Sequence, residues 1–444
     1  MNARDMIASL FIAPFCNKER KNIGVELEFP LLNLCGTAPE KTVIDGLLQH
    51  LLENGFTTEE TDANGNAAFL VNDDGDCLSF DNDYNNFEFA MEKNENLLVI
   101  ANRFYVLFEL VQTYLLPHGH SLTGMGTNPH HHSSKAMPVS YPIYQTLREF
   151  LPEFSGEGYH RFADFPAWLS SVQTHLDVPI DELPRMLTLF SALDFAHGLL
   201  FSNSLPFSDV TDFPDAVCFR DYLWEHSGFG SLSDNTGPVC GTFETADDII
   251  DLFLQKSIFL TKQGKSYQVI DTLPIKDFCD SCNSLSDLDG YLSFKNIEIT
   301  RRGTLEVRSD CAQPVGAAFA PPAFHLGLFK NLEKAEALLE NFLNKLPTDI
   351  SSDPERNKIL RRMVCMGTPL PVKNEDVQAF LLSLTELAAN GLVSRGLGEE
   401  TLLTPLYERA KTMMCPAQHT KMRLSRGDSL SSIIRDYADI HVCL

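Results

Sequence analysis

Four short segments of the sequence carry carboxylate, imidazole and guanidinium groups at alternate positions. The segments are Ile23–Phe29, Asn86–Met91, Ser171–Val178 and Thr304–Ser309. In a β-strand, successive side chains point to opposite faces, so each segment would have one apolar face and one polar face. The polar faces would carry Glu26, Glu28, Glu88, His175 and Glu306, with Gln173, Asp177 and Arg308 beside them.

These polar groups would make a metal site if the four strands belong to one sheet. Carboxylate oxygens with an imidazole suit Mg²⁺ or Mn²⁺ better than a metal that prefers thiolates. So many carboxylates would also repel one another without a cation between them. Arg308 would supply a fixed positive charge, because its planar guanidinium binds phosphate oxygens bidentately. The set therefore predicts a site that stabilises a transferring phosphoryl group.

A second interpretation of the same pattern needs no function. An antiparallel sheet often has one solvated face, on which alternate polar residues are the ordinary outcome. The sequence does not show that the four segments are neighbours, so both interpretations stay open at this point. The repetition of one pattern in four segments favours the metal site.

The elements around these segments predict an α+β fold. Asn22–Pro129 contains short alternating segments and turns, and Lys295–Ser309 also has a strand-like pattern. Helical periodicity predicts the helices Leu97–Leu116, Leu183–Phe201, Lys330–Leu346, Arg356–Cys365, Glu375–Leu392 and Ser429–Tyr437. We expect an α+β catalytic region over residues 1–325 and a helical C-terminal region over residues 326–444, packed on the same domain.

Charge and composition limit the partners. The 444 residues carry a formal net charge of −25, so nucleic acids and anionic membranes would be repelled. The apolar run Leu97–Leu116 contains Arg103 and Glu109, whose cost in hydrocarbon argues against a membrane span. The N-terminal residues show no cleavage site for export. We therefore expect a cytoplasmic protein that binds small molecules.

The cysteines predict no disulfide framework. The eleven cysteines have no regular spacing, which is typical of reduced thiols in a large chain. Cys279 and Cys282 form a single CxxC pair without a second pair or a histidine motif near it. We expect a loop with two incidental cysteines, and we expect the run His130–His132 to be a polar loop.

The segments resemble a known family. Gly24–Phe29, with the letters GVELEF, resembles the opening strand of the glutamate-cysteine ligases and related carboxylate-amine ligases. Gly303–Ser309 with Gln313-Pro314 resembles the closing strand of that family, and Gly124–Pro129 and Asn203–Phe207 resemble two of its short motifs. The likeness extends over residues 22–415. These ligases share their fold with glutamine synthetase.

The resemblance implies a fold, a reaction and roles for particular residues. The fold would be a glutamine-synthetase-like antiparallel sheet with a polar, metal-binding face, flanked by helices. Mg²⁺ or Mn²⁺ would bridge ATP and glutamate, and a γ-glutamyl phosphate would react with cysteine, as in glutathione biosynthesis. By motif, the metal ligands would be Glu26, Glu28, Glu88, His175 and Glu306, Arg308 would be catalytic, and Gln173, Asn203 and Arg220 would contact substrate or ATP.

The chain departs from the family in two places, and these leave alternatives open. The turn before Glu88 is acidic, Asp81–Asn85, where the family has glycine and proline, and His130–His132 has no counterpart. A ligase with another carboxylate or amine substrate therefore remains an alternative, as does a ligase-like binding or regulatory subunit without catalysis. The sequence leaves the number of metals, the oligomeric state and any regulation open.

Overall fold

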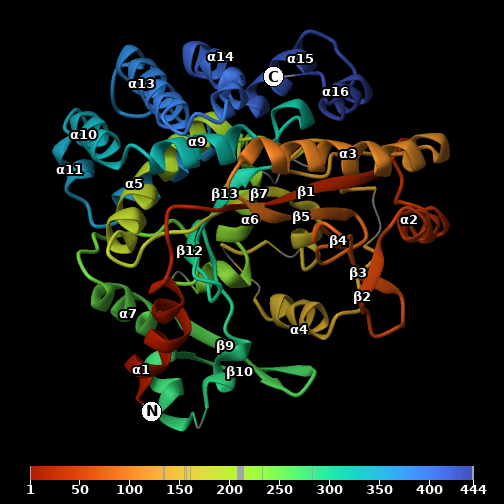
Figure 1. Ribbon diagram of the computed structural model, residues 1–444, viewed down its shortest axis with the longest axis horizontal. Helices are drawn as coiled ribbons and strands as arrows, with labels where there is room; N and C mark the ends of the chain where they lie inside the picture. Colours follow the sequence, from red (N-terminus) through yellow and green to blue (C-terminus); the bar gives the residue numbers. More distant parts are fainter. Residues whose placement is uncertain are drawn as a thin grey trace.

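The structure is a computed structural model that describes residues 2–133, 136–154, 156, 158–160, 162–207, 215–232, 234–282 and 284–442. One large antiparallel sheet crosses its centre (Figure 1). In spatial order, the strands are β12 Ile297–Ile299, β13 Leu305–Cys311, β7 Ser171–Leu176, β1 Ile23–Asn33, β5 Asn86–Asn94, β4 Cys77–Phe80, β3 Ala67–Val71 and β2 Thr57–Thr61.

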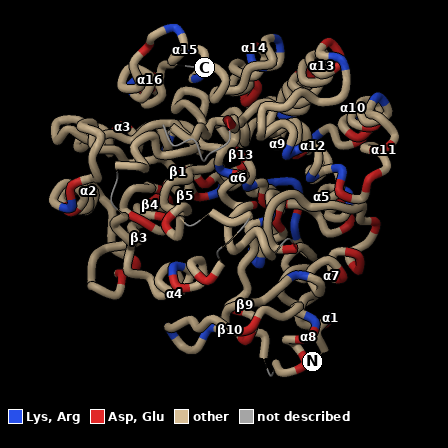
Figure 2. Tube along the Cα trace, turned by 180° about the vertical axis from the view of Figure 1, so that it is seen from behind, with Lys and Arg blue, Asp and Glu red and all other residues tan. Residues whose placement is uncertain are grey.

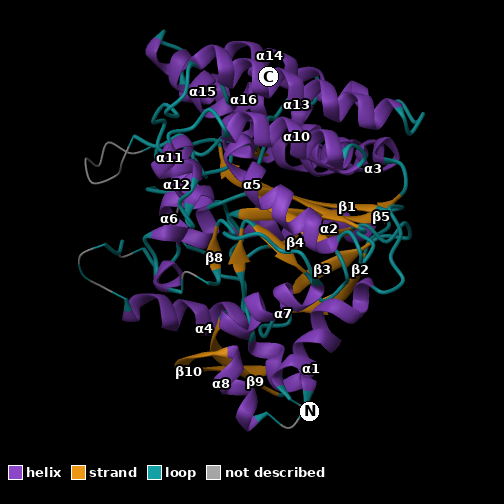
Figure 3. Ribbon diagram, turned by 90° about the vertical axis from the view of Figure 1, so that its left-hand side faces the viewer, coloured by secondary structure: helices purple, strands orange, loops and turns teal. Residues whose placement is uncertain are grey.

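Three smaller strand pairings complete the β structure. The short strand β6, His120–Leu122, pairs with the end of β1. A hairpin of β9, Ser257–Gln263, and β10, Ser266–Pro274, lies below the main sheet (Figure 3). The parallel pair consists of β8, Thr236–Gly237, and β11, Phe294–Lys295.

Helices cover the apolar face of the sheet. The covering helices are α3 Leu97–Leu115, α5 Leu183–Phe201 and α9 Ala320–Phe329. The aromatic rings of Phe29 on β1 and Phe89 on β5 pack against Phe104 and Phe108 of α3, at centroid distances of 5.2–6.2 Å. Alternate residues of the strands thus supply the core, as the sequence pattern predicts, and leave the other face polar.

The C-terminal part of the chain is helical. Its helices lie above α3 and α9 or at one end of the sheet (Figures 1 and 3). They are α10 Leu332–Leu343, α11 Thr348–Ser351, α12 Arg356–Cys365, α13 Asn374–Val393, α14 Thr404–Thr412, α15 Pro416–Ser425 and α16 Leu430–Tyr437. The boundary between residues 325 and 326 stays a prediction, and it falls inside α9.

The remaining helices lie beside or below the sheet (Figure 1). They are α1 Ala3–Ile7, α2 Lys41–Glu53, α4 Pro142–Phe150, α6 Phe219–Glu225, α7 Ala246–Gln255 and α8 Ile275–Phe278. In the part of the chain that the structure describes, we find no helix with the length and apolar character that a membrane crossing requires.

Two strand predictions were wrong in detail. Lys295–Ser309 is not one strand, because a turn closed by Gly303 in the left-handed region (φ 74°) folds β12 back on β13. Ser171–Val178 ends as a strand at Leu176. Asp177 leaves the polar face, since its carboxylate binds Lys18 Nζ at 2.7 Å and Asn22 Nδ2 at 3.0 Å.

Candidate active site on the polar face of the sheet

The four strands singled out by the sequence are direct neighbours, in the order β13-β7-β1-β5. Glu28 on β1 lies opposite Glu88 on β5. His175 on β7 lies opposite Glu306 on β13. The polar side chains therefore meet on one face, called here the carboxylate face and made of Glu26, Glu28, Glu88, His175 and Glu306.

Glu28 is held in place by its neighbours on β7. One oxygen, Oε2, accepts hydrogen bonds from Ser171 N at 2.8 Å and Ser171 Oγ at 3.0 Å, and Oε1 accepts one from Gln173 Nε2 at 2.8 Å. The side chain is almost fully buried. Gln173, predicted to contact substrate, therefore positions a carboxylate of the site.

His175 joins two carboxylates across three strands. Its Nε2 atom lies 3.1 Å from Glu26 Oε1 and 3.9 Å from Glu306 Oε1. Its other nitrogen, Nδ1, lies 3.1 Å from Thr304 Oγ1. The ligand atoms of His175, Glu26 and Glu306 all lie within 4.8 Å of one another, so these three side chains are spaced to converge on one ion.

The other half of the face is rich in repelling carboxylates. Burial and the nearby Asp81 raise the pKa of Glu28 to about 7. Burial, with the charges of Glu26, Asp81 and Glu28, raises the pKa of Glu88 well above its ordinary value. These carboxylates are crowded and desolvated, so their charged forms would be stabilised by a shared cation.

Glu26 differs from these two carboxylates. Burial alone would raise its pKa, but His175, Arg302 and Arg308 outweigh this effect and lower the pKa to about 2. Arg302 Nη2 lies 3.1 Å from Glu26 Oε1. Glu26 is thus ionised at neutral pH and ready to act as a ligand.

The residues present fit a divalent cation that prefers oxygen ligands. Four carboxylates and one imidazole face one another, and burial together with neighbouring carboxylates raises the pKa values of Glu28 and Glu88. Mg²⁺ and Mn²⁺ match this donor set. Glu26, His175 and Glu306 would hold one ion, and Glu28 and Glu88 would serve a second position on the same face.

Arg308 lies between the carboxylate face and a large cavity. Its Nη1 atom is 3.4 Å from Glu306 Oε1, and it lines a cavity of about 790 Å³. Arg220, Lys295 and Arg361 line the same cavity. In Figure 2, basic positions lie near α6 and α12, and acidic positions lie along β4 and β5. Anionic substrates would thus meet fixed positive charges next to the carboxylate face.

The two remaining predicted substrate contacts differ in their placement. Arg220, in α6, lines the cavity and its Nη1 atom lies 3.8 Å from Asp221 Oδ1. Asn203 is buried, and its amide donates to the carbonyls of Gly124 and Ala312 at 2.7 Å each. Asn203 thus ties loops together and does not line the cavity, while Arg220 stays a candidate for substrate binding.

The sequence interpretation singled out the acidic turn that contains Asp81, but it gave no role to Arg361 or Lys295. Asp81 lies in the acidic turn before β5, where its Oδ1 atom accepts a hydrogen bond from Tyr144 at 3.0 Å. Arg361 on α12 is buried and binds Asp221 at 2.7 Å, and Lys295 donates to the carbonyl of Thr236 at 3.0 Å. The sequence pattern could have indicated Arg361, because this charged residue lies on the buried face of its helix.

The two doubtful motifs lie away from the carboxylate face. Of the run His130–His132, His131 is buried against Trp168 with ring centroids 4.8 Å apart, so the expected polar loop is wrong for this residue. Burial and His132 lower the pKa of His131 to about 4. Cys279 and Cys282 are free thiols next to α8.

Glu28 predicts how stability changes with pH. Its pKa is about 7 in the folded protein against an ordinary 4.5, so between these values the folded state holds a proton that the unfolded state lacks. The stability of the metal-free protein should therefore fall as pH rises from 5 to 7 and then level off. We expect the melting temperature in a chelator to show this fall by circular dichroism. A Glu28→Gln variant should show a shallower fall, and an identical fall would contradict the assignment to Glu28.

The curated proteins that match this sequence are glutamate-cysteine ligases. No model of a known protein family matches the sequence. The chloroplastic glutamate-cysteine ligase of Medicago truncatula is 22% identical over 317 residues, covering 68% of this chain and 58% of that protein. Glutamate-cysteine ligase B of Oryza sativa subsp. japonica is 21% identical over 316 residues, covering 68% and 60%. This chain is similar in sequence to glutamate-cysteine ligases. It spans less than two thirds of the length of these plant relatives.

Solved structures of such ligases share the fold of this chain. The glutamate-cysteine ligase of Francisella tularensis, solved in complex with AMP, superposes with a TM-score of 0.51 at 13% identity, covering 95% of this chain and 88% of that one. The bifunctional glutathione synthetase of Pasteurella multocida gives 0.50 at 10% identity, covering 98% and 52%. The expected glutamine-synthetase-like fold with a helical C-terminal region is confirmed.

Proposed function

We propose that this chain is an ATP- and Mg²⁺-dependent ligase that joins the γ-carboxylate of glutamate to the amine of cysteine. The observation that carries the proposal is the convergence of Glu26, Glu28, Glu88, His175 and Glu306 on one face beside Arg308. The named relatives are glutamate-cysteine ligases, and one neighbouring structure contains AMP.

The reaction that we propose consists of two transfers. A γ-carboxylate oxygen of glutamate attacks the γ-phosphorus of ATP, and ADP leaves. The amine nitrogen then attacks the acyl carbon, and phosphate leaves. The carboxylate face would hold divalent cations that neutralise the phosphates, and Arg308 would bind the oxygens of the transferring group. Positioning thus accounts for most of the catalysis.

A different acceptor amine is the second candidate, and Asp81 favours it. This half-buried carboxylate adjoins the carboxylate face, and desolvation raises its pKa. An acceptor with an additional ammonium group would pair with it. A non-catalytic subunit is disfavoured because the ligand set and Arg308 are complete. Cytoplasmic localisation and a role in glutathione biosynthesis belong to the same proposal.

An ADP-release assay tests the function. With Mg-ATP, we expect glutamate and cysteine together to increase ADP release about tenfold or more over either alone, because the second transfer needs both substrates. Omission of Mg²⁺ should abolish the increase. A panel of other amino acids and amines is the comparison. No stimulation by glutamate plus cysteine rejects the first candidate, and no stimulation by any pair, with nucleotide still bound, favours the non-catalytic one.

A further inference from the structure

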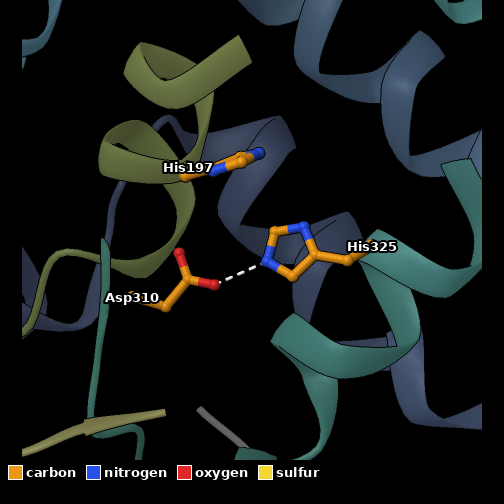
Figure 4. Close-up of side chains that lie close together, drawn as sticks. All are labelled: His197, Asp310 and His325. Atoms are coloured by element: carbon orange, nitrogen blue, oxygen red, sulfur yellow. Dashed lines mark hydrogen bonds and ion pairs between the residues drawn. The ribbon is translucent and has the colours of Figure 1, made fainter. Parts of the chain in front are cut away.

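A second group of metal-type ligands lies on the opposite face of the sheet from the carboxylate face. It consists of His197 on α5, Asp310 on β13 and His325 on α9 (Figure 4), called here the His–Asp–His cluster. All three residues are fully buried. One ligand atom from each lies within 4.8 Å of the others.

A β-bulge brings Asp310 to this cluster. In the pairing of β13 with β7, Val307 lies opposite Thr174, but Asp310 lies opposite Val172. One extra residue is thus accommodated in β13. Strict alternation would place Asp310 on the face of Glu306, and the bulge turns it instead toward the helices that cover the sheet. There the carboxylate meets the two histidines.

The His–Asp–His cluster is poor in hydrogen bonds. Asp310 Oδ2 and His325 Nε2 lie 2.6 Å apart and share one hydrogen bond. In the described part of the chain, no hydrogen-bond partner contacts Asp310 Oδ1, His325 Nδ1 or either ring nitrogen of His197. A buried polar atom without a partner costs about 1–3 kcal/mol. Several such atoms in one cluster point to a ligand between them.

The surroundings favour a metal ion. Aromatic rings of Phe190, Phe201 and Phe324 lie within 6.3 Å of the imidazole centroids and surround the cluster with apolar groups. The neutral imidazole is the form of histidine that binds a metal ion. Neither ring nitrogen of His197 has a hydrogen-bond partner among the described residues, so a nitrogen is free to face an ion.

We propose that His197, Asp310 and His325 bind a divalent metal ion of the zinc class that ties β13 to α5 and α9. Two imidazoles and one carboxylate are a common zinc donor set, and they differ from the oxygen-rich set of the carboxylate face. Bonds of about 2.0 Å place tetrahedral ligand atoms about 3.3 Å apart, so binding would draw the three side chains inward. The site does not depend on the proposed function.

The buried carboxylate of Asp194 lies next to the His–Asp–His cluster, where it could orient a metal-bound histidine. Asp194 Oδ1 lies 3.9 Å from His197 Nδ1. Arg361 and Asn296 hold Asp194, with Asn296 Nδ2 donating to Oδ2 at 2.7 Å. Carboxylates that face the second nitrogen of a metal-bound histidine commonly orient its ring.

Metal analysis of the full-length protein tests the proposal. After equilibration with Zn²⁺ in excess Mg²⁺ and removal of free ions, we expect one equivalent of zinc per chain by mass spectrometry. His197→Gln and Asp310→Asn should each weaken zinc binding roughly 100-fold or more, since a ligand is lost. The matched controls are Glu306→Gln on the carboxylate face and Cys279→Ser in the CxxC pair, which should retain the zinc.

Two further measurements distinguish the outcomes. Cobalt substitution should give visible d–d bands without a thiolate charge-transfer band, because the site has no sulfur ligand; such a band would place the metal on the cysteines and overturn the proposal. If the variants fail to fold, the melting temperature of the wild-type protein tests the proposal. Its melting temperature should fall with a strong chelator and recover with Zn²⁺. An unchanged melting temperature, or no bound zinc, would show a cluster bridged by water only and overturn the proposal.

Discussion

A Glu88→Gln variant should lose ATP turnover while its metal-free form becomes more stable. Glutamine keeps the size of the side chain but cannot supply the charge that a divalent cation needs, so we expect ADP release to fall about 10²–10³-fold. Burial and three facing carboxylates raise the pKa of Glu88, so at pH 8 removal of its charge should relieve repulsion. We therefore expect the metal-free variant to unfold at a higher denaturant concentration than the wild-type protein.

A loss of ATP turnover together with a gain in stability would distinguish this site from an ordinary solvated sheet face. ADP release in saturating Mg-ATP and chemical denaturation in a chelator are the two measurements. Glu92→Gln is the matched control, because Glu92 lies on the same strand, four residues further along, and is exposed. Equal activity of the Glu88→Gln and Glu92→Gln variants would contradict a metal role for Glu88.

An Arg308→Lys variant should lower kcat about 10²-fold with a smaller change in the KM for ATP. Lysine retains the positive charge beside Glu306, which limits any loss of stability, but it lacks the planar fork that binds two phosphate oxygens. The loss should therefore appear in the transition state more than in ground-state binding. Steady-state kinetics over a range of ATP concentrations separates kcat from KM.

The control for Arg308 comes from the turn that precedes β13. Arg301 pairs with Asp289 at 2.8 Å and, unlike Arg308, does not line the cavity, so Arg301→Lys should keep wild-type kinetics. If Arg308→Lys also keeps them, or raises KM alone, the assignment of Arg308 to the phosphoryl transfer is wrong.

The sequence predicted the face of the sheet well because strand alternation is a local property. Glu28, Glu88 and His175 share a face because each lies at an alternate position between apolar residues. The neighbour relations between strands came from the family resemblance and not from alternation. The sheet order confirms that these strands are adjacent.

Other parts of the site depend on distant contacts that no local pattern contains. Asp81 belongs to the site because the turn before β5 lies next to the carboxylate face. Arg361 belongs to a helix about 50 residues after β13 in the chain, and it contacts the backbone of β13. The bulge that redirects Asp310 places one extra residue in β13. No residue type in this segment marks the position of the bulge in the sequence. Asn203 lies in a segment that resembles a motif of the family, and the resemblance therefore predicts that it contacts substrate. Its amide instead donates hydrogen bonds to backbone carbonyls.

The bulge in β13 also limits how this region can vary in length among related chains. Glu306 and Arg308 face the polar side, and Asp310 faces the helices. Deletion of a single residue between Val307 and Asp310 would exchange the faces of the residues that follow, which would move Asp310 to the side of Glu306 and Cys311 to the side of the helices. Relatives that keep both sets of residues should therefore align through this strand without a gap, and a one-residue gap there would mark a lineage in which one of the two clusters has been lost.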